Sequence, residues 1–182
     1  MQRVLIIATD GFEQSELMLP KQGLEEAGIE TTVASLEDGE IKGWDNNDWG
    51  KSVSVDITVD EVGVADYDAL LLPGGQINPD ILRLNETVID LIKEFDSEGK
   101  PIAAICHAPW LLIEADIVDG KTVTSWPSVR TDLENAGGEV IDRQVAVDGN
   151  LITSRNPDDI PAFTEALKDA LTNAQSRVPE NA

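Results

Sequence analysis

The fold of this chain is constrained most by its alternation of short, continuous apolar runs with segments of helical period. Residues 4–9, 69–72 and 101–105 are apolar at nearly every position, which is typical of strands buried on both faces. Segments with helical spacing lie between these runs. Strands that alternate with helices predict an α/β fold, a flavodoxin-like three-layer sandwich around a mostly parallel sheet. Ligands are expected beyond the carboxyl ends of such strands.

The other expected elements complete a single domain over residues 1–175. Strands are predicted at 31–35 and 53–59, with a short one at 122–125 and a hairpin over 139–154 that turns at Asp148-Gly149-Asn150. Helices are predicted at 13–27, 87–95, 108–115, 129–136 and 158–174. Residues 44–50 are interpreted as a polar loop with two tryptophans, and residues 176–182 as a frayed polar tail.

The charge of the chain is strongly one-sided. It carries 35 Asp and Glu residues against 13 Lys and Arg, which gives a formal net charge of −22 and a pI near 4.1. Nucleic acid is excluded as an expected partner, because no basic surface is available to neutralise phosphates. Repulsion of this size opposes folding in dilute buffer, whereas molar salt shortens the screening length to about 3 Å. We interpret the composition as adaptation to the salty cytoplasm of a halophile. A generic acidic bacterial protein is the alternative.

Several classes of site are excluded by what the chain lacks. A single cysteine rules out a disulfide framework and a Cys-rich zinc site, and a single histidine rules out a His-rich metal cluster. No Gly-rich phosphate loop follows the first strand, so no nucleotide cofactor is expected. The N-terminal apolar run is too short for a signal peptide, and no stretch is long enough to span a membrane. We therefore expect a cytoplasmic protein without metal, cofactor or membrane partner.

The single cysteine, Cys106, is followed directly by the single histidine, His107. The pair lies between an apolar strand and a helical pattern, and a sharp strand-to-helix turn is where an α/β protein holds a nucleophile. The turn exposes the sulfur, and the start of the following helix favours a thiolate. A structural role is the alternative, because cysteine is commonly a small buried apolar residue.

Two other segments end at the same edge of the predicted sheet. Glu16 lies about one turn into the first helix, and a carboxyl group confined beside a thiol tends to be protonated and to donate a hydrogen bond. Gly74 and Gly75 follow a buried strand, and their amides could form an oxyanion hole together with the amide of His107. The alternatives are a solvated helix glutamate and an ordinary turn at the end of a strand.

Short motifs spread over nearly the whole chain resemble those of a known family. In chain order they are Asp10-Gly11-Phe12-Glu13, Leu72-Pro73-Gly74-Gly75, Ala104-Ile105-Cys106-His107, Thr124-Ser125-Trp126-Pro127 and Thr153-Ser154-Arg155-Asn156-Pro157. Their sequence and order resemble the PfpI family, a stand-alone branch of the class I glutamine amidotransferase-like superfamily. The tryptophan-containing segment 44–50 is most similar to the general-stress-protein-like members.

The resemblance implies a role for each residue at this edge. Cys106 becomes the nucleophile, Glu16 its carboxyl partner and His107 the general base. Family members complete the Cys-His pair with a carboxylate from a neighbouring subunit, and the corresponding residue here is Asp80, which is shorter by one methylene. Trp126 stands where a tyrosine or histidine commonly lines the pocket. The family also implies a homodimer or larger homo-oligomer, with the site near a subunit interface.

The activity that the resemblance implies is that of a cysteine-dependent stress-protection enzyme acting on a carbonyl group. A peptide substrate would make it an intracellular cysteine peptidase, and methylglyoxal or a glycated adduct would make it a glyoxalase III-like or deglycase-like enzyme. We favour the small carbonyl compound, because a site walled by Trp126 and by a subunit boundary admits small substrates most easily. The alternative is a redox-sensing stress protein without turnover, in which Cys106 is oxidised to sulfinic acid.

Overall fold

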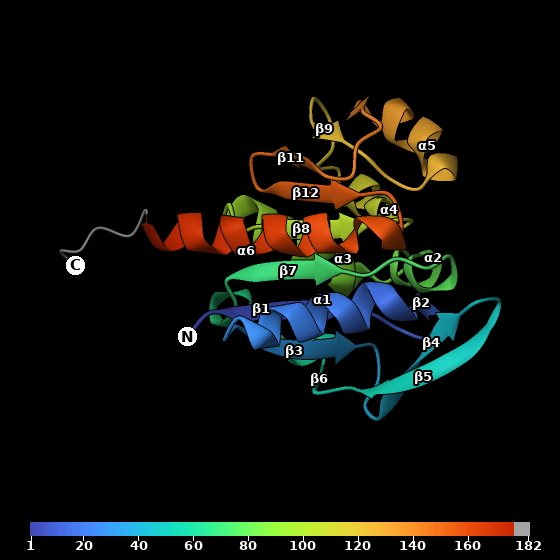
Figure 1. Cartoon of the computed structure of the whole chain (residues 1–182), viewed down its shortest axis with the longest axis vertical. Helices are drawn as coiled ribbons and strands as arrows, with labels where there is room; N and C mark the ends of the chain where they lie inside the picture. Colours follow the sequence, from blue (N-terminus) through green and yellow to red (C-terminus); the bar gives the residue numbers. More distant parts are fainter. Residues whose placement is uncertain (177–182) are drawn as a thin grey trace.

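The computed structural model describes residues 1–176, and its centre is a seven-stranded sheet (Figure 1). In spatial order the strands are β11 (Ala146–Asp148), β12 (Leu151–Ser154), β8 (Ile102–Ile105), β7 (Ala69–Leu72), β1 (Arg3–Ile7), β3 (Glu30–Ser35) and β6 (Ile57–Thr58). All neighbours are parallel except β11 and β12, which are antiparallel. From β3 to β12 the parallel strands follow the flavodoxin-like order 2-1-3-4-5. The predicted fold class is thereby confirmed.

Helices cover both faces of the sheet. In Figure 1, α1 (Gln14–Glu26) and α6 (Ile160–Ser176) lie in front of the sheet, and α3 (Glu86–Ser97) and α4 (Pro109–Glu114) lie behind it. The short helix α2 (Ile77–Leu82) lies at the carboxyl ends of the strands, and α5 (Arg130–Asn135) packs against α4. This arrangement is the three-layer sandwich predicted from the alternation of strands and helices.

The side chains of the central strands divide between two buried cores. On β1, Leu5 and Ile7 point into the core shared with α3 and α4, whereas Val4 and Ile6 point into the core shared with α1 and α6. All four are completely buried. Burial on both faces explains why the strand is apolar at every position, since alternate residues serve different cores.

The segment 44–50, predicted to be a loop, forms a β-hairpin instead. Strands β4 (Glu40–Asp45) and β5 (Asp48–Ser54) are antiparallel, and Asn46 and Asn47 form the turn with φ of 47° and 65°. Two residues with positive φ are what a tight hairpin turn requires, and asparagine tolerates that conformation better than most residues. The polar composition hid the hairpin because these strands are largely exposed. They extend a small sheet with β2 (Phe12–Glu13) beside the main one.

Three other boundaries differ from the prediction. The short helix α2 was not predicted, because six residues with a proline inside show no clear helical period. The expected hairpin over 139–154 is restricted to β11 and β12. Its first residues form β10 (Glu139–Val140), which pairs in parallel with β9 (Thr122–Val123). The expected strand 53–59 is divided between the end of β5 and β6. Helix α6 ends at Ser176, and the rest of the predicted tail, residues 177–182, lies outside the described residues.

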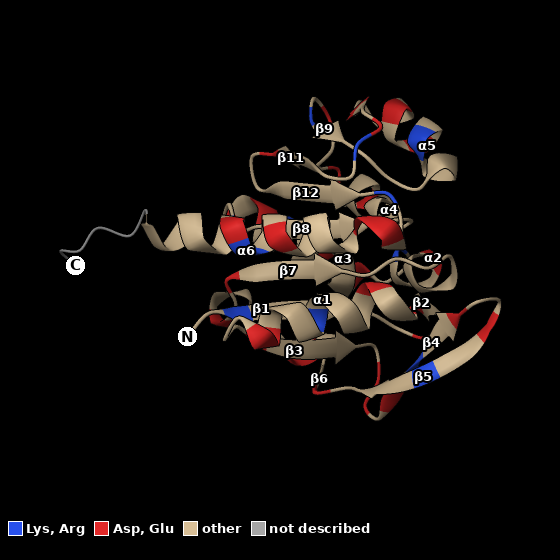
Figure 2. Cartoon of the chain, viewed as in Figure 1, with Lys and Arg blue, Asp and Glu red and all other residues tan. Residues whose placement is uncertain are grey.

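Charged residues lie mostly around the sheet, and those on its strands, such as Arg3, Glu30 and Asp148, stand at strand ends (Figure 2). Asp and Glu lie on the helices, the loops and the β4–β5 hairpin, while β7, β8 and β12 carry no charged residue. The excess negative charge is therefore distributed over the outside of the fold. In the part of the chain that the structure describes, no helix combines the length and the apolar character needed to cross a membrane.

Candidate active site

Cys106 lies on the sharp turn between β8 and α4, at the carboxyl edge of the sheet. Its φ of 66° is in the left-handed region, which costs a non-glycine residue about 1–3 kcal/mol. Two backbone hydrogen bonds hold this conformation. The Cys106 N–H donates to the Ser154 carbonyl at 3.0 Å, and the Cys106 carbonyl accepts from the Trp126 N–H at 2.9 Å. The turn is therefore a nucleophile elbow of the kind expected from the sequence.

Glu16, in the first turn of α1, is completely buried beside the thiol. Its Oε1 accepts the Gly74 N–H at 3.1 Å, and its Oε2 is buried without a hydrogen-bond partner among the described residues. Burial, and secondly repulsion from Glu13, raises the pKa of Glu16 to about 8. Glu16 is therefore largely protonated at neutral pH, and the interpretation as a solvated helix residue is wrong.

The turn formed by Gly74 and Gly75 faces the elbow at very short range. A Cβ on Gly74 would lie 2.5 Å from Oε1 of Glu16 and 2.8 Å from the Cβ of Cys106, so only glycine fits. Gly75 has a φ of 85°, and its amide interacts with the Cys106 thiol, as does the amide of His107. Of the three predicted oxyanion-hole donors, Gly74 already donates to Glu16. The amides of Gly75 and His107 are those that face the sulfur.

Asn78 supports this turn, and the sequence analysis did not identify it. The residue is completely buried in α2. Its Oδ1 accepts the Thr9 N–H at 2.8 Å, and its Nδ2 donates to the carbonyls of Pro73 and Gly74 at 2.9 and 3.1 Å. One side chain thus joins the end of β1 to the turn after β7. The only sequence signal was a polar residue three positions after the Pro-Gly-Gly turn.

The imidazole of His107 contacts the thiol directly. Its Nδ1 lies 3.2 Å from the Sγ of Cys106. The ring stacks on Trp126, with centroids 5.7 Å apart and planes at 23°, and it meets the indole of Trp110 at 5.1 Å and 66°. Trp126 is 38% exposed beside the imidazole, and its role in lining the site stays a prediction. Trp110 therefore contacts the imidazole from the first turn of α4.

Burial acts on the thiol and on the imidazole in opposite directions. It raises the pKa of the Cys106 thiol, and repulsion from an ionised Glu16 raises this pKa further, whereas the amides of Gly75 and His107 lower it. Burial lowers the pKa of His107. Both shifts favour a neutral thiol beside a neutral imidazole at rest. The expectation that the turn alone favours a thiolate is therefore replaced by a dependence on proton transfer to His107.

Asp80 is separate from the thiol and the imidazole within this chain. It is exposed in α2, and no hydrogen bond joins it to His107 or to any other side chain among residues 1–176. Its predicted action on a neighbouring subunit therefore stays a prediction. Within residues 1–176, no group of three or more His, Cys, Asp or Glu side chains is placed to hold a metal ion.

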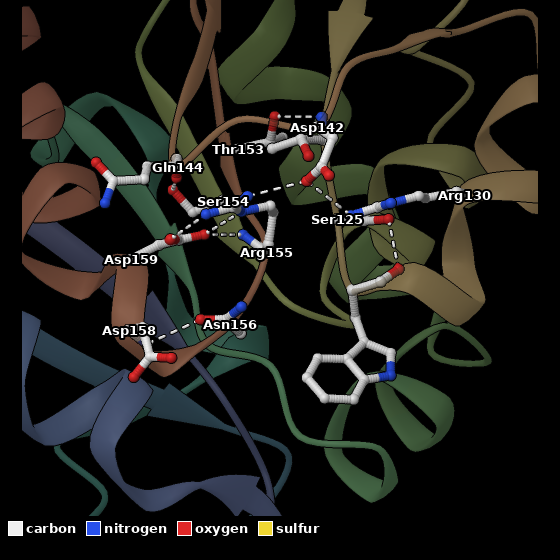
Figure 3. A network of polar contacts seen from close by, with 12 residues as sticks. Ser125, Arg130, Asp142, Gln144, Thr153, Ser154, Arg155, Asn156, Asp158 and Asp159 are labelled. Atoms are coloured by element: carbon white, nitrogen blue, oxygen red, sulfur yellow. Dashed lines mark hydrogen bonds and ion pairs between the residues drawn. The ribbon is translucent and has the colours of Figure 1, made fainter.

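An ion-pair network fixes the segment that supports the elbow (Figure 3). Arg155 donates its backbone N–H and Nε to Oδ2 of Asp159 and a terminal nitrogen to Oδ1, each at 2.9 Å. Asp159 is 1% exposed, whereas Asp142, which both Arg130 and Arg155 contact, is largely exposed. The network positions the adjacent Ser154, whose carbonyl accepts from the elbow.

These groups together suit addition to a carbonyl. A thiol with an adjacent neutral base can become a nucleophile at the moment of attack. Two amides near the sulfur can bind the oxyanion that forms, and the protonated Glu16 can supply an acid beside the thiol. The geometry therefore brings a thiol, an imidazole, a carboxyl group and two backbone amides together within one chain.

Comparison with known proteins agrees with this geometry. The DJ-1/PfpI family model matches residues 2–170. A Thermococcus kodakarensis protein named deglycase TK1284 is 45% identical over 161 residues, which is 88% of this chain and 94% of that protein. General stress protein 18 of Bacillus subtilis is 43% identical over 164 residues, 89% of this chain and 93% of that protein.

A solved structure from Anabaena variabilis, described as a two-domain protein containing DJ-1/ThiJ/PfpI-like and ferritin-like domains, superposes with a TM-score of 0.90 at 34% identity. The match covers all of this chain and 52% of the Anabaena chain. Sequence and structure therefore agree that the chain belongs to the DJ-1/PfpI family.

Proposed function

We propose that this protein is a cysteine-dependent repair enzyme that removes dicarbonyl adducts from amines, with free methylglyoxal as a related substrate. The observation that carries the proposal is the 3.2 Å contact between Cys106 Sγ and His107 Nδ1, made beside a buried, protonated Glu16. The names deglycase and general stress protein of its relatives support the same class of activity.

The reaction would begin with an adduct in which an amine nitrogen is bonded to the aldehyde carbon of methylglyoxal. The Cys106 thiol transfers its proton to His107 as the sulfur bonds to that carbon. The carbon–nitrogen bond breaks, and the amine leaves with a proton supplied by the imidazolium. The product on the enzyme is a thiohemiacetal, and the repaired amine is released. With free methylglyoxal, the sulfur adds to the aldehyde carbonyl and the oxygen is protonated.

The remaining steps rearrange the thiohemiacetal without an external oxidant. A proton leaves the carbon bonded to sulfur, and a proton is added to the neighbouring carbonyl carbon, so that one carbon is oxidised and the other is reduced. The thioester of lactate results, and water hydrolyses it to lactate and the free thiol. Glu16 and His107 are the groups placed to move these protons, and the amides of Gly75 and His107 bind the oxyanions.

Assembly into a homo-oligomer forms part of the proposal. Asp80 is exposed on α2, and Ile77 and Ile81 on the same short helix are 38% and 40% exposed. A second copy seated on this helix would cover the two isoleucines and bring a carboxylate towards His107. Sedimentation of wild type and Ile81→Glu tests this arrangement. A dimer that the substitution dissociates supports it, and a wild-type monomer with full activity contradicts it.

The experiment for the proposed function uses a lysine- or arginine-containing peptide treated with methylglyoxal and freed of unreacted aldehyde. The assay runs in molar KCl, because a net charge of −22 disfavours the folded chain in dilute buffer. Wild type is expected to release several equivalents of lactate per chain and to regenerate the unmodified peptide. Cys106→Ser is the matched control and is expected to release none. Equal release by both proteins contradicts the proposal.

Two other activities are outcomes of the same experiment. Cleavage of the peptide backbone, with no lactate, would identify a peptidase. Stoichiometric oxidation of Cys106 by dilute peroxide, without turnover of either substrate, would identify a redox sensor. The burial of Cys106 argues against the sensor, because oxidation is favoured at exposed cysteines.

A further inference from the structure

The catalytic imidazole has no carboxylate partner within its own chain. Among residues 1–176, Nδ1 of His107 contacts the Cys106 sulfur, and no side chain forms a hydrogen bond with Nε2. A general base usually has its ring orientation fixed by a third group. The side chains that do contact the ring are two indoles, those of Trp110 and Trp126.

Trp110 is placed against His107 by the first turn of α4. The backbone N–H of Trp110 donates to the His107 carbonyl at 3.1 Å, and residues three apart on a helix lie on the same face. The two rings meet edge to face at 5.1 Å and 66°, which is a favourable geometry for an aromatic pair. The position of the indole relative to the imidazole therefore follows from the local backbone.

Trp110 is itself held from two other helices. Its Nε1 donates to Oδ2 of Asp132 in α5 at 3.0 Å. The guanidinium of Arg83, which follows α2, lies 5.3 Å from the indole centroid and pairs with Glu114 at 2.8 Å. Trp110 is half-buried, and it also packs against the core shared with α3 and α4. Its indole is fixed on both sides by polar contacts while one edge meets the imidazole.

We propose that Trp110 is a positioning residue for His107, and that Asp132 and Arg83 hold its indole so that Nδ1 of the imidazole stays directed at the Cys106 sulfur. This inference rests on the proposed role of His107 as the base, but it does not depend on which carbonyl compound is the substrate. The indole replaces, within one chain, part of the orienting function that a carboxylate performs in other Cys-His pairs.

The test uses alkylation of Cys106 by iodoacetamide, which needs no knowledge of the substrate. Because the chain has one cysteine, every alkylation event reports on Cys106. The rate at neutral pH depends on proton transfer to His107, whereas the rate at high pH depends on the thiolate alone. Trp110→Ala is expected to lower the neutral-pH rate about tenfold and to leave the alkaline rate unchanged, since even a misplacement of about 1 Å at a catalytic group can cost about a hundredfold.

A smaller perturbation separates positioning from folding. Asp132→Ala removes the hydrogen bond to the indole without touching the site, and is expected to lower the neutral-pH rate by a few fold. Asp132→Asn retains an acceptor for the indole N–H and is expected to restore the neutral-pH alkylation rate. Trp49→Ala is the matched control, because Trp49 forms a similar edge-to-face pair with Trp44 at 5.2 Å and 82°, in the β4–β5 hairpin.

The single histidine provides a second readout by NMR. In wild type the His107 ring protons are expected to be shifted by the neighbouring indoles and sharp, and in Trp110→Ala to be broader and closer to free histidine. The proposal is overturned if Trp110→Ala and Asp132→Ala both fold and retain the wild-type ratio of neutral to alkaline rates. It is also overturned if both rates change in parallel, because that result indicates altered access to the thiol. Loss of lactate release in wild type would instead contradict the proposed function and leave these ratios unaffected.

Discussion

The Gly74 N–H donates to Oε1 of Glu16 at 3.1 Å, so the turn after β7 is bonded to the buried carboxyl group beside Cys106. This contact explains why two glycines and a helix glutamate occur together at the edge of the sheet. The turn places the Gly75 amide near the sulfur, and the carboxyl group fixes the turn. Substitutions at either end of the contact should therefore affect both stability and chemistry.

Glu16→Gln should remove a pH dependence of stability. The pKa of Glu16 is about 8 in the folded chain, against an ordinary value of 4.5. Between these values the folded chain holds a proton that the unfolded chain has released, so this group lowers stability as the pH rises from 4.5 to 8. The slope is about 1.4 kcal/mol per pH unit. Urea unfolding at a series of values from about pH 5 to about pH 8 should show the free energy of unfolding of wild type falling relative to that of Glu16→Gln. The exposed Glu37→Gln serves as control, and parallel curves for wild type and Glu16→Gln would contradict the prediction.

Asn78→Ala should destabilise the fold and reduce activity together. The substitution removes the hydrogen-bond partner of the Thr9 N–H and of the Pro73 carbonyl, whereas the Gly74 carbonyl keeps the Glu13 N–H at 3.3 Å. Each buried group left unsatisfied costs about 1–3 kcal/mol. Thermal melting and the alkylation rate of Cys106 measure the two effects. Asn173→Ala, at an exposed position of α6, should change neither. A wild-type melting temperature for Asn78→Ala would show that the turn does not depend on this side chain.

Gly74→Ala should be much more harmful than an alanine at a glycine whose close neighbour is only the end of a flexible side chain. The added Cβ would meet Oε1 of Glu16 and the Ile105 carbonyl, each at 2.5 Å. Forcing atoms into a packed site costs about 1–3 kcal/mol. Gly63→Ala is the comparison, because its nearest neighbour is the end of the Asp66 side chain at 3.3 Å. Urea unfolding of the two variants should separate them, and similar midpoints would disprove the close packing described for the turn.

Stability should increase with salt over a wide range. A net charge of −22 implies repulsion throughout the folded surface (Figure 2). The screening length falls from about 10 Å at 0.1 M salt to about 3 Å at 1 M. The melting temperature should therefore rise steadily as KCl is added over this interval. A melting temperature that is constant or falls would count against the interpretation of the composition as halophilic.

Local patterns were enough to predict the framework of the site. The apolar strand before Cys106 and the helical pattern after it identified the elbow, and the position of Glu16 one turn into its helix placed it at the same edge. Both predictions depend on short-range periodicity and on the rule that parallel strands end at a common edge. They needed no information about contacts between distant segments.

The details that escaped the sequence analysis depend on such contacts. Asn78 resembles any polar loop residue until Thr9 is known to lie 2.8 Å away. The β4–β5 hairpin was missed because its exposed strands bury too few residues to give an alternating pattern. The raised pKa of Cys106 was missed because the elbow predicts a thiolate, whereas the depth of burial is a property of the packed structure.

The central claim is that Cys106 reacts by transferring its proton to His107. Its most direct test is the pH dependence of Cys106 alkylation in wild type and in His107→Gln. Because burial lowers the pKa of His107 and raises that of the thiol, wild type should show a reactivity plateau between the two. His107→Gln should lose the plateau and retain only the alkaline rise. Its alkylation rate at neutral pH should be about a hundredfold lower than that of wild type. Superimposable profiles for the two proteins would contradict the account.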